Sequence, residues 1–264
     1  MKCKVCGNLT NKIFNAQVLN KYEVNYYWCK VCKFIQTEEA FWLDEAYLKA
    51  VSITDTGQIS RNLSNANILK TIIPILIKNP QKLKFLDYGA GYGILVRLMR
   101  DTGYDFFWYD KFCKNLFAVG FEANKIDNFK IITAFELFEH FSDPIGEIKS
   151  ILEFNTPDFL IFSTNIYKEE IPEKSWWYYS FESGQHISIY HLYTLRYIAN
   201  KFDYYLLTDN NNLHIFTKYK FSNKYFNFTL KYLKYFSLFK KNKIKSRTFE
   251  DHLYLKNIIN NKNI

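Results

Sequence analysis

Four cysteines near the amino terminus have the spacing of a metal site. They form two pairs with two intervening residues each, Cys3 with Cys6 and Cys29 with Cys32. A two-residue spacer in a tight turn lets both thiolates reach one ion at about 2.3 Å, and two such turns complete a tetrahedral shell. Zinc held in this way has no open position for water. The pairs therefore predict a structural zinc site.

Other uses of these thiols stay open. An iron centre of the rubredoxin type has the same ligand spacing, and four ordinary buried cysteines are a third interpretation. Redox chemistry is disfavoured, because neither pair lies at a strand-to-helix turn of a βαβ pattern. The fifth cysteine, Cys113, stands alone, and an odd number of cysteines fits poorly with the disulfide framework of a secreted protein.

A glycine-rich segment between two apolar runs is a second candidate site. It consists of Asp87, Gly89, Gly91 and Gly93 at alternate positions. Alternating glycines let the backbone turn sharply and approach a ligand closely, and the helix that follows presents free N–H groups. The segment therefore predicts a nucleotide-like ligand. A dinucleotide is disfavoured, because its fingerprint needs the third glycine one residue later, where Ile94 stands.

A histidine within an aromatic segment is the candidate catalytic base. The segment from Trp176 to His191 follows a predicted strand, so it should lie at the carboxyl edge of the sheet, where ligands bind. Because imidazole titrates near neutrality, we predict that His186 is a general base, and that Gln185 or Glu182 orients it or holds the substrate. The aromatic side chains suit a sugar or another small polar molecule. A structural role for His186 and a catalytic role for His191 are alternatives.

The elements that must position these residues follow from the hydrophobic pattern. Short apolar runs alternate with amphipathic stretches, which is typical of βαβ units and a parallel sheet. Strands are expected near Leu83–Tyr88, Phe106–Tyr109, Phe129–Ala134 and Phe159–Ser163, helices near Ile94–Asp101, Pro144–Phe154 and Thr194–Phe202, and an antiparallel hairpin at Tyr204–Thr208 and Leu213–Thr217. The expected fold class is therefore α/β, a Rossmann-like and mostly parallel sheet that ends in an antiparallel hairpin.

The glycine segment and the terminal hairpin resemble the class I S-adenosylmethionine-dependent methyltransferases. Asp87 to Gly93 reads D-x-G-x-G-x-G, which resembles motif I of that family. The resemblance implies that this loop packs against the amino-acid half of S-adenosylmethionine. An acidic residue about 20 positions further on should then bind the ribose hydroxyls, and Asp110 occupies that place. A solvated strand-end aspartate is the alternative for Asp110.

The next part of the chain extends this resemblance. Residues 131 to 140 resemble the family's fourth strand and the E-x-x-E-H turn that follows it. The resemblance implies that Ala134, Glu136 and His140 lie beside the sulfonium of the cofactor. Glu136 and His140 also suit the start of a helix, so a capping role is an alternative for both.

The order of all these motifs is similar to that of the zinc-containing sugar methyltransferases of antibiotic and surface-polysaccharide pathways. The similarity spans residues 1 to 217 and implies a nucleotide-linked sugar, or a capsule or lipopolysaccharide precursor, as the acceptor. Those enzymes often methylate carbon with a Glu-His pair, and here Gln185 takes the place of that glutamate. We therefore expect O- or N-methylation rather than C-methylation.

Composition divides the chain into four segments. We predict a zinc-binding module at 1–38, a helical bridge at 39–80, the S-adenosylmethionine-binding domain at 81–218 and a basic aromatic tail at 219–264. With no apolar run of about 18 residues and no signal peptide, a cytoplasmic location is expected.

The positive charge of the chain belongs to the tail. The formal net charge is +9, and residues 218–264 alone hold 12 Lys+Arg against 2 Asp+Glu. The rest of the chain is nearly neutral, so no nucleic-acid partner is expected. The tail either packs on the domain or makes a weak contact with an anionic membrane surface. An RNA methyltransferase and a non-catalytic cofactor-binding scaffold or sensor remain alternative functions.

Overall fold

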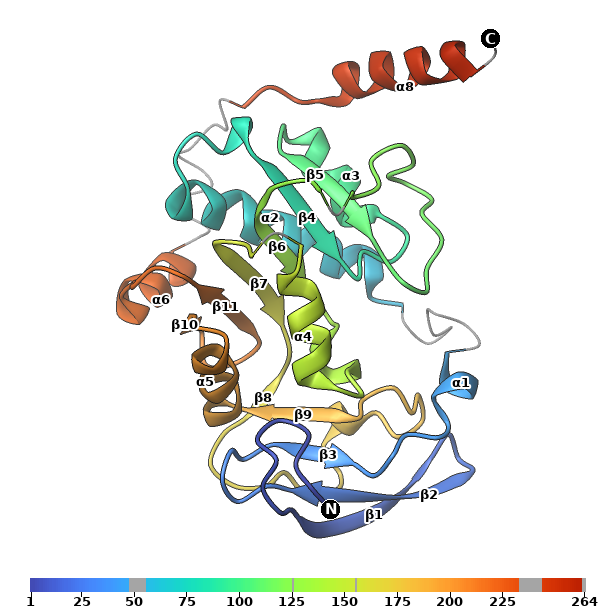
Figure 1. Cartoon of the computed structure of the whole chain (residues 1–264), viewed down its shortest axis with the longest axis vertical. Helices are drawn as coiled ribbons and strands as arrows, with labels where there is room; N and C mark the ends of the chain where they lie inside the picture. Colours follow the sequence, from blue (N-terminus) through green and yellow to red (C-terminus); the bar gives the residue numbers. More distant parts are fainter. Residues whose placement is uncertain (48–55, 125, 155, 233–243, 263–264) are drawn as a thin grey trace.

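The computed structural model of the chain describes residues 1–47, 56–124, 126–154, 156–232 and 244–262 (Figure 1). Two β-sheets build the molecule. In Figure 1 a six-stranded sheet with its helices occupies the upper and central part, and a five-stranded sheet lies at the lower end near the amino terminus.

The six-stranded sheet has the strand order β10-β11-β7-β6-β4-β5. Its strands are β4 (Lys84–Tyr88), β5 (Asp105–Tyr109), β6 (Phe129–Ala134), β7 (Phe159–Ser163), β10 (Tyr205–Thr208) and β11 (Leu213–Thr217). Strands β4 to β7 pair in parallel, whereas β11 is antiparallel to both β7 and β10. The predicted α/β fold with its terminal antiparallel hairpin is thereby confirmed.

Helices cover both faces of this sheet, which explains the apolar character of its central strands. Alternate residues of a strand point to opposite faces, so Phe85 packs against one layer and Leu86 against the other. The first layer contains α2 (Gln58–Leu76) and α3 (Ile94–Asp101), and the second contains α4 (Pro144–Leu152) and α5 (Leu192–Lys201).

The five-stranded sheet joins distant parts of the chain. Its order is β1-β2-β3-β9-β8, from β1 (Asn11–Val18), β2 (Tyr22–Trp28), β3 (Ile35–Thr37), β9 (Ser188–His191) and β8 (Ile166–Tyr167). Strand β3 pairs antiparallel with β9. The amino-terminal module thus shares its sheet with the segment that carries Gln185 and His186. The sequence pattern did not indicate this pairing, because β3, β8 and β9 are too short to show a periodicity.

The predicted helical bridge contains the short helix α1 (Leu43–Ala46) and α2, while its residues 48–55 lie outside the described part of the chain. In the tail the structure describes α6 (Asn223–Lys231) and α8 (Thr248–Lys262). Residues 233–243, which hold part of the alternating aromatic and lysine pattern, lie outside the described residues. Among the helices that the structure describes, none is long and apolar enough to cross a membrane.

Candidate active site

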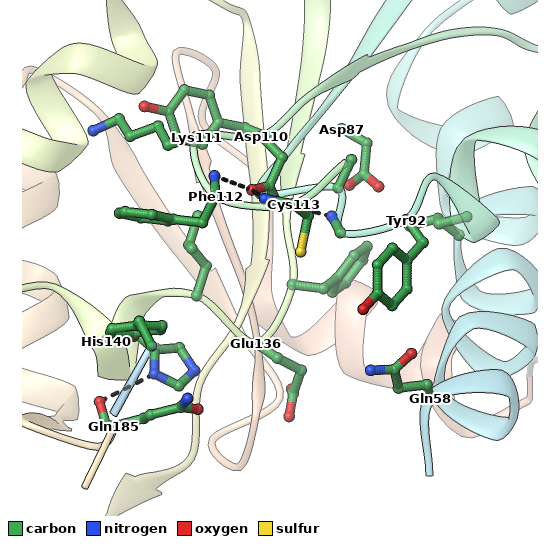
Figure 2. Close-up of a pocket in the computed structure, with 18 of the residues that line it drawn as sticks. Gln58, Asp87, Tyr92, Asp110, Lys111, Phe112, Cys113, Glu136, His140 and Gln185 are labelled. Carbon is green, nitrogen blue, oxygen red and sulfur yellow. Dashed lines mark hydrogen bonds between the residues drawn. The ribbon is translucent and has the colours of Figure 1, made fainter. Parts of the chain in front are cut away.

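A cavity of about 450 Å³ opens at the carboxyl ends of β4, β5 and β6. The glycine loop after β4, the loop after β5, the turn after β6 and helix α2 form its walls. Figure 2 shows Asp87 and Asp110 at one end of the cavity and Glu136, His140 and Gln185 at the other. This is the edge at which parallel α/β sheets bind ligands.

The glycine loop presents bare backbone to the cavity. Gly91 has a φ of +54°, and a Cβ built there would meet nothing within 4 Å. Its N–H donates to Asp110 Oδ2 at 2.9 Å, and its carbonyl accepts from Trp108 Nε1 at 2.8 Å. Hydrogen bonds on both sides therefore hold the loop in place, while the left-handed backbone leaves room for a ligand beside it.

Asp110 connects the glycine loop to the loop after β5. Its Oδ1 accepts the N–H groups of Phe112 and Cys113, each at 2.7 Å, in addition to the Gly91 bond to Oδ2. A carboxylate has about four acceptor sites. One site is thus left for a further donor, such as a ligand hydroxyl.

Asp87 lies beneath the loop and is a different kind of carboxylate. It is buried, and Thr133 Oγ1 donates to its Oδ1 at 2.6 Å. Burial raises the pKa of Asp87 to about 7, with a smaller contribution from the negative charge of Asp110. Asp87 therefore holds a proton more readily than an exposed aspartate, and it lines the cavity.

Glu136 is held at the other end of the cavity by an unusual backbone. Its φ is +50°, a conformation that is strained for a residue with a side chain. Ser163 Oγ accepts the N–H of Glu136 at 2.8 Å and donates to its Oε1 at 2.5 Å. Burial and the nearby charge of Glu139 raise the pKa of Glu136. This carboxylate lines the cavity and is fixed in orientation.

Two histidines stand together beside Glu136. His140 Nδ1 donates to the carbonyl of Gln185 at 3.0 Å, and His186 Nδ1 donates to the carbonyl of Tyr178 at 2.6 Å. Because a carbonyl only accepts, both rings carry a proton on Nδ1, which leaves Nε2 of each ring available for another partner. The ring centroids are 5.1 Å apart. Burial and repulsion from His186 lower the pKa of His140 to about 3.

One main-chain hydrogen bond and one side-chain hydrogen bond bring these two histidines together. The N–H of Ile187 donates to the carbonyl of Glu139 at 2.9 Å, and Ser188 Oγ donates to the carbonyl of Phe141 at 2.6 Å. The turn at Phe138–His140 is therefore attached to the segment that enters β9.

Of the other predicted site residues Gln185 lines the cavity, whereas His186 and the residues Ala134, Gly93, Glu182 and His191 do not. Ala134 is fully buried, and Gly93 is the residue that precedes α3; neither lines the cavity. Glu182 is exposed and also lies outside the lining. His191 caps α5: its Nδ1 accepts the N–H of Tyr193 at 3.0 Å and its Nε2 donates to the carbonyl of Lys168. Gln185 lines the cavity, and its Nε2 donates to the carbonyl of Ala46 at 2.9 Å.

Several lining residues were missed by the sequence analysis. Helix α2 contributes Gln58, Arg61, Asn62 and Asn65 to the cavity wall. Their spacing of i, i+3, i+4 and i+7 places them on one helix face, so a polar stripe was visible in the sequence. Glu139, for which the sequence pattern predicts no role, is buried beside the two histidines.

Two aromatic rings also line the cavity without having been predicted. Tyr47 stacks on Phe112, with ring centroids 5.6 Å apart and an interplanar angle of 12°. The sequence held no signal for this pair, because the two residues are far apart in the chain.

The four cysteines form a compact cluster in the turns before β1 and between β2 and β3. Their Sγ atoms all lie within 4.8 Å of one another, with Cys3 to Cys32 at 3.5 Å and Cys6 to Cys29 at 3.4 Å. Thiolates about 2.3 Å from one tetrahedral ion would be about 3.8 Å apart, so the donor set and its size fit zinc. A hydrogen bond with Cys32 lowers the pKa of Cys3 to about 5. The bound metal itself remains a prediction.

The cysteine cluster is also tied to the active-site side of the molecule. Cys3, Cys29 and Cys32 belong to the same apolar core as α4 and α5. Thr194 Oγ1 donates to the carbonyl of Cys32 at 2.7 Å. The cluster thereby supports β3, the strand that pairs with β9.

Comparison with known proteins identifies a family to which the part of the chain around the cavity is similar. A family model described as a methyltransferase domain matches residues 61–209, more than half of the chain. The match includes the glycine loop, Asp110 and the turn with Glu136 and His140. No curated protein matches the chain.

Solved methyltransferase structures resemble the chain at low sequence identity. The mitomycin 7-O-methyltransferase MmcR is 11% identical, with a TM-score of 0.42, over 66% of this chain and 59% of that one. Magnesium protoporphyrin IX methyltransferase from Synechocystis PCC 6803 with bound SAH is 11% identical, with a TM-score of 0.41, over 67% and 94%. The plantazolicin methyltransferase BpumL in complex with SAH is 12% identical, with a TM-score of 0.44, over 69% and 95%. The chain thus spans about three fifths of the mitomycin enzyme's length.

Proposed function

The chain belongs to the methyltransferase domain family, and we propose that this S-adenosylmethionine-dependent enzyme methylates an oxygen or a nitrogen of a small polar acceptor. The acceptor we propose is a nucleotide-linked sugar or another precursor of a bacterial capsule or lipopolysaccharide. One observation carries the proposal: a single cavity runs from the glycine loop and Asp110 to Glu136, His140 and Gln185. A methyl donor and a polar acceptor can therefore meet in one enclosed space.

The loop end of the cavity suits S-adenosylmethionine. The backbone of Gly91 faces open space, and Asp110 keeps one acceptor site for a ribose hydroxyl. Asp87 and Gly89 complete this end of the lining. Ala134, Gly93, Glu136 and His140 are proposed cofactor neighbours on the family resemblance alone. The cofactor, when bound, supplies a methyl group activated by positively charged sulfur.

The lining opposite the loop suits a hydroxyl-rich acceptor. The polar stripe of α2 and the amide of Gln185 offer several hydrogen-bond donors and acceptors. The Tyr47 and Phe112 rings provide apolar faces against which a sugar or a base can pack. Gln185 carries no charge, which favours an oxygen or nitrogen acceptor over a carbon that must first be deprotonated.

The acceptor must lose a proton as its oxygen or nitrogen attacks the methyl group. Because the pKa of His140 is lowered to about 3, that imidazole is a weak base. We therefore assign proton removal to His186, whose Nδ1 is anchored on Tyr178 and whose Nε2 is left available for another partner. His186 stands behind His140, with ring centroids 5.1 Å apart, so the proton would pass from an acceptor at the cavity end that His140 lines to His186 Nε2 behind it.

Labelled S-adenosylmethionine and a panel of nucleotide sugars, incubated with the full-length protein, test this function. We expect label in a sugar, and we expect His186→Gln to lower turnover by about 10²- to 10⁴-fold while the affinity for S-adenosylhomocysteine is retained. His252→Gln on the exposed face of α8 is the matched control. Transfer of label to RNA alone, or full turnover by His186→Gln, would refute the assignment.

A further inference from the structure

We propose that Glu139, His140 and His186 form a binding site for a divalent transition-metal ion at the acceptor end of the cavity. The site is separate from the four-cysteine cluster. Its catalytic consequence rests on the proposed function, but ion binding does not.

The three side chains have the geometry of an open metal site. One ligand atom from each, a carboxylate oxygen and two ring nitrogens, lies within 4.8 Å of the others. Ligands about 2.0–2.2 Å from one ion are about 3–4 Å apart, so a small inward movement of the side chains is enough to bind it. The turn at Phe138–His140 and the segment before β9 supply the ligands, and a main-chain hydrogen bond from Ile187 N–H to the Glu139 carbonyl joins these two segments.

Glu139 provides an independent indication of a missing cation. Its side chain is 1% exposed, and its Oε2 has no hydrogen-bond partner among the described residues. In the same part of the chain, no Lys or Arg forms an ion pair with it. The nearby carboxylate of Glu136 adds to the negative charge. A buried carboxylate without a partner is strongly unfavourable, and a bound cation would compensate it.

The histidines are oriented as metal ligands are. A metal-ligating imidazole almost always donates its other ring N–H to a carbonyl or a carboxylate, which fixes the tautomer and the ring orientation. Both rings do so here, through Nδ1 to the carbonyls of Gln185 and Tyr178. The remaining Nε2 atoms are the ligand atoms we assign.

The donor set indicates the class of ion and of acceptor. Two imidazoles and one carboxylate without sulfur suit Mn²⁺, Fe²⁺, Co²⁺, Ni²⁺ or Zn²⁺ better than Mg²⁺ or Ca²⁺. Three protein ligands leave coordination positions open. Because His140 lines the cavity, an ion held here would face an acceptor hydroxyl and would lower its pKa. The site therefore favours a hydroxyl acceptor. With the ion bound, His186 would act as a ligand, and the carboxylate of Glu136, which lines the cavity, would take the hydroxyl proton in its place.

Titration with Mn²⁺ of full-length protein that carries a single zinc per chain, in the cysteine cluster, followed by electron paramagnetic resonance, tests the site. Mn²⁺ prefers nitrogen and oxygen ligands to thiolates, so it reports on this site rather than on the cysteine cluster. We expect saturable binding of one Mn²⁺, weakened at least about tenfold by Glu139→Gln and by His186→Asn. Glu153→Gln and His252→Asn, both exposed, are the charge-matched and ring-matched controls. Retained affinity for S-adenosylhomocysteine shows that each variant is folded.

The outcomes separate this site from the proposed function. No saturable Mn²⁺ binding, or equal binding by the wild type and both site variants, would overturn the metal site. Full sugar methylation by protein that holds a single zinc per chain, in the cysteine cluster, and no other metal would overturn the catalytic consequence of the site and leave the proposed function standing. Mn²⁺ binding that needs Glu139 and His186, in a protein that methylates no sugar, would support the metal site and refute the proposed function.

Discussion

Replacing Asp110 with asparagine tests how the cofactor loop is held. The carboxylate accepts three backbone N–H groups, two on Oδ1 and that of Gly91 on Oδ2. An asparagine side chain keeps a single acceptor oxygen. If that oxygen takes the Oδ1 position, the amide NH₂ faces the Gly91 N–H and one hydrogen bond is lost.

The size of the effect follows from these bonds. An unsatisfied donor costs about 1–3 kcal/mol, and the two remaining bonds weaken because they lose the charge of the acceptor. We expect the free energy of unfolding to fall by about 2–4 kcal/mol. At about 2–4 °C per kcal/mol for a chain of this size, the Tm should fall by roughly 4–16 °C.

Ligand affinity gives the second readout. A hydrogen bond from a ribose hydroxyl to a charged acceptor contributes about 1.5–3 kcal/mol, so S-adenosylhomocysteine should bind Asp110→Asn about ten- to a hundredfold more weakly. Calorimetric titration and thermal unfolding measure the two effects on the same sample. Asp203→Asn is the control, since Asp203 is exposed and has a positive φ of 60° that asparagine adopts readily.

Each result has a distinct meaning. A lower Tm with unchanged ligand affinity would show that Asp110 supports the loop without contacting the ribose. An unchanged Tm together with unchanged affinity would refute the whole argument, including the view that the loop depends on this carboxylate.

Three further predictions concern stability. Burial raises the pKa of Asp87 from 3.8 to about 7, so the folded state keeps a proton that the unfolded state releases, and stability should fall as pH rises from about 4 to 7. At about 1.4 kcal/mol per pH unit the loss is roughly 4 kcal/mol. Urea unfolding should therefore show Asp87→Asn to be more stable than the wild type at about pH 8 but not at about pH 4. Metal analysis should find that the zinc content falls by one per chain, together with several degrees of Tm, in Cys29→Ser and not in Cys113→Ser; an unchanged zinc content in Cys29→Ser would contradict the site. Arg100 forms a buried bidentate pair with Asp251 of α8, at 2.8 Å for each bond. Arg100→Ala should therefore lower the free energy of unfolding, measured with denaturant, by about 3–5 kcal/mol. A decrease below about 1 kcal/mol would show that this pair does not hold α8 in place.

Where the sequence analysis succeeded, the signal was local. The strands at Phe129–Ala134 and Phe159–Ser163 and the helix at Ile94–Asp101 have the predicted bounds. Their apolar runs and amphipathic faces encode which side is buried, and this pattern needs only neighbouring residues. The helix that was expected to begin at Thr194 begins at Leu192 instead, because the His191 side chain caps it, and a histidine is an uncommon capping residue.

The candidate site was predicted in part for the same reason. The glycine loop and Asp110 follow directly from strands, and both line the cavity. The wall from α2 was missed although its polar stripe was present, because a polar helix face is usually exposed to solvent and nothing in the sequence says that a cavity lies against it.

The glycine loop, the cysteine spacing and the order of strands and helices were determined by the sequence itself, since each depends on a few consecutive residues. Only the tertiary structure decided that β3 pairs with β9, and that Glu139 and His140 meet His186 from a distant part of the chain. Such contacts arise when the packing of whole elements brings remote segments together, and a single sequence carries no local signal for that packing. The loop and cysteine positions were therefore foreseeable, and the chemistry at the acceptor end was not.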